Sequence, residues 1–176
     1  MRQLLLLRHA KSCWSNPGLS DHARPLAQRG LLAAAAMRRA MQELGLQPDL
    51  VLVSSARRTL QTLQALEPWD ETPLVEPMDG LYLAGPEQLL KALRGLPETM
   101  RSVMLIGHNP GLHELAVMLV GAHGMAMANA SARRLASGYP SGALAEFTVA
   151  APWQRLGEGT GRLVRFVCPN DLPEAA

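Results

Sequence analysis

The chain of 176 residues is long enough for one domain with a hydrophobic core and short for two. A formal net charge of +2 gives no reason to expect a nucleic-acid or membrane partner. The two cysteines, Cys13 and Cys168, lack metal-binding spacing, and no apolar run reaches secretory-signal or transmembrane length. We therefore expect a cytoplasmic protein with reduced thiols.

The hydrophobic pattern predicts strands and helices that alternate over most of the chain. Short apolar runs predict the strands, and longer stretches of helix formers predict the helices. We interpret residues 67–86 as a loop with a short strand at 74–75, and residues 121–142 as a mobile or irregular connection. The predicted strands are 3–7, 49–53, 102–106, 143–149 and 162–167, and the predicted helices are 28–44, 57–66, 87–93 and 112–120.

This order predicts an α/β fold with three layers, in which helices flank a mainly parallel central sheet within a single domain, 1–176. In such sheets, ligands bind beyond the carboxyl ends of the strands. Arg8 and His9 follow the first strand, Arg57 and Arg58 follow the second, and His108 follows the third. Polar residues at strand ends often serve solubility alone. Three such ends at one sheet edge nevertheless predict that two histidines and at least two arginines converge there.

Two arginines and two histidines suit the chemistry of phosphoryl transfer. Guanidinium groups bind a tetrahedral oxyanion through paired, charge-assisted hydrogen bonds. Their positive field also lowers the pKa of a nearby histidine, so the imidazole stays neutral and can attack phosphorus in line. The second histidine can donate a hydrogen bond to the developing charge. Because the arginines supply the compensating charge, we expect no metal and no cofactor.

Four strings carry a resemblance to a known family: RHAKS at 8–12, RPL at 24–26, SSARRTLQT at 54–62 and GHNPG at 107–111. In this order they resemble the histidine phosphatase superfamily, and more narrowly its small, capless SixA-type phosphohistidine phosphatases. The resemblance covers about the first 120 residues and implies a phosphoglycerate mutase-like fold without a cap domain. Two positions depart from the RHG-type pattern: Ala10 stands where many members have glycine, and Ser55 where proline is common.

The resemblance implies a role for each matched residue. His9 matches the nucleophile, Arg8 the arginine before it, and His108 the second histidine. Arg58, rather than Arg57, is in register with the phosphate-binding arginine, so we expect Arg57 to face solvent.

Three further residues are candidates for substrate binding: Ser12, Arg24 and Asn109. Arg24 could reach the rim of the pocket or fix the loop by pairing with Asp21, and Ser12 could donate to phosphate or stabilise a turn.

The need of the leaving group for a proton distinguishes the candidate substrates, phosphate esters and phosphohistidine. An alkoxide benefits from a carboxylic acid that protonates it, and Asp79 is the candidate for that role. An imidazole leaves more easily, so the missing acid motif and missing cap favour phosphohistidine on a protein. Two alternatives stay open: a small-molecule phosphomonoesterase, and a non-catalytic module that binds phosphate or a phosphoprotein. The expected partner is thus a phosphorylated protein or a small phosphorylated substrate, with no nucleic acid and no membrane.

Overall fold

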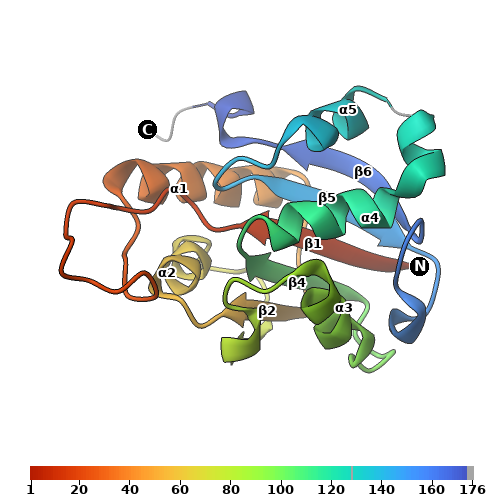
Figure 1. The fold of residues 1–176 in the computed structure, drawn as a ribbon, viewed down its shortest axis with the longest axis horizontal. Coiled ribbons are helices and arrows are strands. Elements are labelled where there is room, and N and C mark those ends of the chain that lie inside the picture. Colours follow the sequence, from red (N-terminus) through yellow and green to blue (C-terminus); the bar gives the residue numbers. More distant parts are fainter. Residues whose placement is uncertain (128, 174–176) are drawn as a thin grey trace.

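The computed structural model describes residues 1–127 and 129–173, and one six-stranded sheet runs through it (Figure 1). The strand order is β3-β2-β4-β1-β5-β6. The first four strands of this order pair in parallel, and β5 and β6 pair antiparallel at one edge. The strands are β1 (Arg2–Arg8), β2 (Leu50–Ser54), β3 (Leu74–Met78), β4 (Ser102–Gly107), β5 (Leu144–Val149) and β6 (Gly161–Val167).

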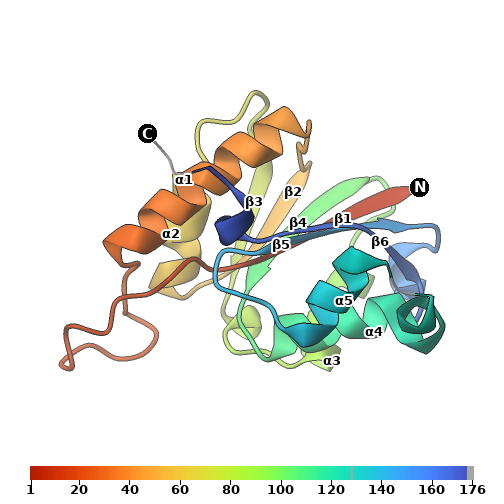
Figure 2. The ribbon, with the colours of Figure 1, turned by 90° about the horizontal axis from the view of Figure 1, so that it is seen from above.

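Helices cover both faces of the sheet, which confirms the predicted three layers. Figure 2 shows α1 and α2 on one face and α3, α4 and α5 on the other. The helices are α1 (Gln28–Glu43), α2 (Arg57–Ala65), α3 (Pro86–Arg94), α4 (Gly111–Ala126) and α5 (Ala130–Ser137), with 3-10 turns η1 (Asp79–Leu81), η2 (Trp153–Arg155) and η3 (Pro169–Asp171). The connection from α2 to β4 holds only β3, η1 and α3, so it contains no cap domain.

The four consecutive leucines of β1 contribute side chains to the core on both faces of the sheet. Because successive strand residues point to opposite faces, Leu4 and Leu6 pack with α3, α4 and α5, whereas Leu5 and Leu7 pack with α1 and α2. All four side chains are at most 1% exposed. β1 is therefore buried on both faces, as its uninterrupted apolar sequence predicts.

The register of the parallel strands brings the polar motifs to one edge of the sheet. Arg8 pairs with Gly107 across β1 and β4, so His9 and His108 each stand one residue beyond that pair. β2 lies on the other side of β4 and ends at Ser54, three residues before α2 begins. The predicted convergence of the three strand ends is confirmed.

The expectation of an irregular connection at 121–142 is wrong, because most of it is helical. α4 continues to Ala126 through a kink at Gly121, whose φ of 74° is a left-handed conformation suited to glycine. α5 follows, with the Asn129 side chain accepting from the amide of Ala132 and Leu135 fully buried. Glycine and alanine hid this helical pattern in the sequence. Residue 128, within the same segment, lies outside the described residues.

Two smaller features complete the fold. β3 extends over Leu74–Met78 rather than 74–75, and Pro77 is tolerated because β3 is an edge strand. No helix in the described part of the chain is long and apolar enough to cross a membrane.

Candidate active site

His9 is held as a neutral imidazole with one nitrogen committed to the backbone. Its Nδ1 lies 2.7 Å from the carbonyl oxygen of Ala10, and since a carbonyl only accepts, Nδ1 must carry the proton. Burial lowers the pKa of His9 to about 4, and the charges of Arg58 and Arg8 act in the same direction. The neutral ring therefore keeps an unshared electron pair on Nε2 at physiological pH, which is the requirement for a nucleophile.

His108 lies beside His9, with the two ring centroids 5.3 Å apart. Its Nε2 is 2.7 Å from the hydroxyl of Ser54, and its Nδ1 is buried without a hydrogen-bond partner among the described residues. Burial lowers the pKa of His108 to about 3, helped by His9 and Arg58. The second imidazole is thus also neutral, with Nδ1 available to a ligand.

The tandem arginines separate as predicted. Arg57 is exposed, whereas Arg58 is only 3% exposed and lies in the cavity that contains His9. Arg8 enters the same cavity and donates from Nη1 to the carbonyl of Tyr139 at 2.9 Å. The Nε atoms of Arg8 and Arg58 are buried and have no partner among the described residues. Buried donors without partners are rare in folded proteins and point to a missing acceptor.

Asp21 is the carboxylate of this cavity, and it is ionised. Its Oδ2 accepts from Nη2 of Arg58 at 3.1 Å, and its Oδ1 accepts from Nη2 of Arg24 at 2.8 Å. The hydroxyl of Tyr82 also donates to Oδ2. The bond from Tyr82, followed by those from the two arginines, holds the pKa of Asp21 well below its ordinary value. Asp21 therefore orients the arginines and has no proton to give near neutral pH.

The three candidate substrate-binding residues all line the cavity around His9, whose volume is about 370 Å³. Arg24 does both things expected of it: it pairs with Asp21 and faces the cavity, where its guanidinium lies 3.3 Å from the ring centroid of Trp14. Ser12 accepts from Nη1 of Arg24 at 3.1 Å. Asn109 donates from Nδ2 to the carbonyl of Tyr139 at 2.9 Å.

Asp79 is the one candidate that the structure does not bring to this cavity. It is exposed at the start of η1 and is not among the cavity residues. The described cavity lining thus offers one carboxyl group, that of Asp21. No group of three or more histidine, cysteine, aspartate or glutamate side chains in the described chain is arranged to hold a metal.

Two motif residues join the loops of the site rather than facing it. The side-chain oxygen of Gln61 accepts from the amide of Leu26 at 2.7 Å. The hydroxyl oxygen of Thr62 accepts from the amide of Ala10 at 3.0 Å and donates to the carbonyl of Arg58 at 2.7 Å. Through this pair, α2 fixes the RHA and RPL strings around Arg58.

The sequence reasoning missed four supporting residues: Ser54, Tyr82, Tyr139 and, as a member of the site, Asp21. Ser54 is the first residue of the SSARRTLQT string, and Asp21 stands three residues before Arg24 of the RPL string, so their positions were an available signal. Tyr82 and Tyr139 lie in segments without a motif, and only the fold brings them to the strand ends.

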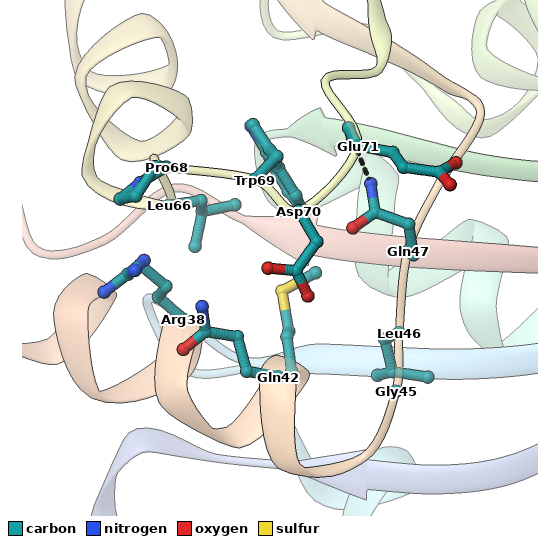
Figure 3. A pocket seen from close by; sticks show the side chains of 11 residues that line it. Arg38, Gln42, Gly45, Leu46, Gln47, Leu66, Pro68, Trp69, Asp70 and Glu71 are labelled. Atoms are coloured by element: carbon teal, nitrogen blue, oxygen red, sulfur yellow. Dashed lines mark hydrogen bonds between the residues drawn. The ribbon is translucent and has the colours of Figure 1, made fainter.

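A second cavity, of about 310 Å³, lies away from the histidines, between the C-terminal half of α1 and the segment that follows α2 (Figure 3). Arg38 and Gln42 from α1 face Asp70 and Trp69 across it, and the buried Leu66 also lines it. It shares no residue with the cavity around His9.

Comparison with known proteins agrees with this geometry. A sequence profile of the histidine phosphatase superfamily, branch 1, matches residues 4–81. An uncharacterized protein of Mycobacterium tuberculosis is 30% identical over 171 residues, covering 93% of this chain and 100% of that protein. The chain belongs to the histidine phosphatase superfamily. It spans 60% of an uncharacterized chloroplastic protein of Arabidopsis thaliana, with 33% identity over 133 residues and 69% of this chain covered.

Within the superfamily, the chain has a small, SixA-like structure. A protein of Agrobacterium tumefaciens assigned to the SixA phosphohistidine phosphatases is 30% identical, with a TM-score of 0.80 over 96% of this chain and 98% of that one. A protein of Nakamurella multipartitia with the same assignment has a TM-score of 0.82 at 26% identity over 96% of each chain.

Proposed function

We propose that this protein is a phosphatase that works through a phospho-His9 intermediate and acts on phosphohistidine in a protein. The observation that carries the proposal is the cluster of His9, Arg8, Arg58 and His108 in one cavity with both imidazoles neutral. Membership of the superfamily and the likeness to SixA-assigned proteins support the same chemistry.

In the first step, Nε2 of His9 attacks the phosphorus atom in line with the departing nitrogen of the substrate imidazole. The new Nε2–P bond forms as the substrate N–P bond breaks, and the substrate leaves as neutral imidazole when its other ring nitrogen carries a proton. In the second step, water attacks the phosphorus of phospho-His9, which releases inorganic phosphate and restores His9.

Arg8, Arg58 and His108 stabilise the charge on the equatorial oxygens during both steps. The guanidinium groups offer fixed, delocalised charge and donors in a plane, and a neutral imidazole offers one more donor. Arg24 and Asn109 complete the donor side of the cavity. The guanidinium groups of Arg8, Arg24 and Arg58 supply the charge compensation that phosphoryl transfer needs.

The state of the carboxyl groups favours an imidazole leaving group over an alkoxide. An alkyl phosphate needs a protonated acid beside its leaving oxygen. Asp21, however, is ionised and accepts hydrogen bonds from the side chains of three residues, and Asp79 lies outside the cavity. Phosphohistidine needs no such acid. The cavity therefore fits phosphohistidine better than a phosphate monoester.

The test is a panel of substrates with the wild-type protein and the His9→Ala variant. We expect phosphate release from phosphohistidine proteins at a far higher rate than from alkyl phosphates, with no release by His9→Ala. Brief incubation with radioactive phosphohistidine substrate should label wild type with an acid-labile, base-stable phosphoryl group that His9→Ala does not acquire. Efficient turnover of alkyl phosphates alone would instead indicate a small-molecule phosphomonoesterase, and binding without turnover would indicate a non-catalytic module.

A further inference from the structure

A groove opens directly beside the cavity that holds His9. It lies between the first turns of α1, the turn at residues 140–141 and the segment around η3, with a volume of about 510 Å³. Figure 2 shows η3, in dark blue, lying beside α1. The groove shares Lys11 and Ser141 with the cavity around His9, so the two hollows are direct neighbours. We call this hollow the α1 groove.

The α1 groove carries positive charge that no described residue balances. Lys11 and Arg29 are exposed and line it, and neither side chain forms a hydrogen bond or ion pair with another described residue. Arg29 is the second residue of α1, whose first turn contains no acidic residue and has no side-chain cap. A cation near the N-terminus of a helix interacts unfavourably with the helix dipole, so Arg29 destabilises α1.

Close packing brings the backbone of Lys11 against the first turn of α1, which bears Arg29. The carbonyl of Lys11 accepts from the amide of Ala27 at 2.9 Å, and a Cβ atom at Gly30 would lie only 2.2 Å from the same oxygen. Glycine therefore lets the start of α1 lie directly against the strand end that bears His9. The backbone positions from which Lys11 and Arg29 extend are therefore fixed relative to His9.

Apart from Ser141 and Asn170, the other described residues that line the groove are apolar. Leu32 is 49% exposed on the turn of α1 that follows Arg29, and Ala33, Ala36 and Leu172 extend the apolar surface. No carboxylate is among the described residues that line it. The α1 groove thus offers cations beside an exposed leucine, next to the site of phosphoryl transfer.

We propose that the α1 groove binds the chain segment next to the phosphorylated residue of a protein substrate, and that this segment carries acidic and large apolar side chains. The inference rests on the proposed function, because a phosphoryl group on a protein side chain can reach His9 only if its flanking residues cover the rim of the cavity. Unbalanced cations and a helix N-terminus select carboxylates. Leu32 selects an apolar neighbour.

Phosphohistidine peptides that differ only in their flanks test the proposal. The probes have a leucine and two flanking residues that are both glutamate, both glutamine or both lysine, and phosphoimidazole serves as a probe without flanks. We expect kcat/KM of wild type to be about tenfold higher for the glutamate peptide than for the lysine peptide at low ionic strength, with the difference shrinking as salt is added. Arg29→Glu should remove most of this difference, because the new carboxylate offsets the charge of Lys11. It should also raise Tm, because glutamate suits the start of a helix.

Arg39→Glu is the matched control, since Arg39 is exposed on the same helix outside the α1 groove. It should keep the preference of wild type. Leu32→Ser should lower kcat/KM for all three peptides relative to phosphoimidazole. Equal rates of wild type for the glutamate and lysine peptides, or the same loss of preference in Arg39→Glu, would overturn the groove proposal while phosphoimidazole turnover upholds the phosphatase. Loss of turnover for every probe would overturn both.

Discussion

The two imidazoles of the site differ in which ring nitrogen the protein engages. His9 uses Nδ1 to donate to the backbone and keeps Nε2 for attack, whereas His108 uses Nε2 toward Ser54 and keeps Nδ1 for the ligand. The same residue type can therefore act once as nucleophile and once as hydrogen-bond donor. The partner of the opposite nitrogen decides between these roles.

Arg58 and Arg57 form a matched pair at the residue scale. Arg58→Ala should lower kcat/KM by about 10²–10³, because it removes preorganised donors from the transferring phosphoryl group. Arg57→Ala should change the unfolding free energy by less than about 0.5 kcal/mol and leave kcat/KM near wild type, because its side chain is exposed. Steady-state kinetics and urea unfolding of both variants provide the measurement. A larger kinetic loss in Arg57→Ala would contradict the assignment of Arg58 to the phosphate.

Ser54 is expected to position His108. Its hydroxyl accepts from the amide of Ala56 at 3.3 Å and lies 2.7 Å from Nε2 of His108. If the hydroxyl donates to Nε2, the proton of His108 sits on Nδ1. In Ser54→Ala, His108 should no longer be held in the tautomer with its proton on Nδ1, which ¹⁵N chemical shifts of the ring would show. We expect kcat/KM to fall by about tenfold, or about 1.4 kcal/mol.

The Ser54→Ala result has a clear alternative. If kcat/KM falls but the ¹⁵N shifts of His108 stay unchanged, Ser54 supports the fold around β2 rather than the tautomer.

At the scale of elements, the site depends on two helices that begin against backbone. α1 meets the strand end through Gly30, and α4 meets the segment before α3 through Gly111. The start of α1 lies against the segment that bears His9, and the start of α4 lies against the segment that bears Tyr82. The glycines therefore set how closely the three strand ends are enclosed.

Gly111→Ala should test this enclosure. A Cβ atom there would lie 1.8 Å from the carbonyl oxygen of Ala84, so α4 or the segment 82–85 must move. We expect a loss of about 1–3 kcal/mol in unfolding free energy, together with lower activity, because Tyr82 and His108 flank the contact. Gly80→Ala is the control, since a Cβ at Gly80 meets nothing within 4 Å, and it should leave the unfolding free energy within about 0.5 kcal/mol. Equal losses in both variants would contradict a specific role for the contact.

At the scale of the whole molecule, the buried histidines link stability to pH. Folding lowers the pKa of His9 to about 4 and that of His108 to about 3, from an ordinary value of 6.5. Between these values the unfolded chain binds protons that the folded protein does not bind, so acid favours unfolding. The folded protein therefore has its full unfolding free energy above pH 6.5, where both histidines are neutral in either state. Part of that free energy is lost as the pH falls toward about 4.

Urea unfolding at a series of pH values measures this link. The unfolding free energy should fall between pH 6.5 and 4 by up to about 1.4 kcal/mol per pH unit for each of the two histidines. His108→Asn should reduce that slope by about one proton. His123→Gln serves as the comparison variant, because His123 is exposed on α4 and lies outside the cavity around His9. An unchanged slope in His108→Asn would show that folding leaves the affinity of His108 for protons unaltered.

The sequence by itself determined the α/β class, the central strands and the four residues Arg8, His9, Arg58 and His108. It could do so because those signals are local: an apolar run long enough for a buried strand, followed at once by the motif residue. The resemblance of the SSARRTLQT string to the family motif separated Arg58 from Arg57, because only Arg58 is in register with the phosphate-binding arginine. The sequence pattern did not predict the helices in 121–142, because alanine and glycine give little contrast between apolar and polar helix faces.

Only the tertiary structure decided which groups contact and orient these four candidate site residues. The carbonyl of Tyr139 holds Arg8 and Asn109, and the hydroxyl of Tyr82 reaches Asp21, across 131, 30 and 61 residues of sequence. Such contacts depend on strand order and on the angle at which helices pack, which no short window of sequence encodes. The exclusion of Asp79 has the same cause, because η1 turns its side chain to solvent while Tyr82, three residues later, faces the site. The chemistry of the cluster is local to the motifs, whereas its electrostatic state is set by burial, which only the folded chain creates.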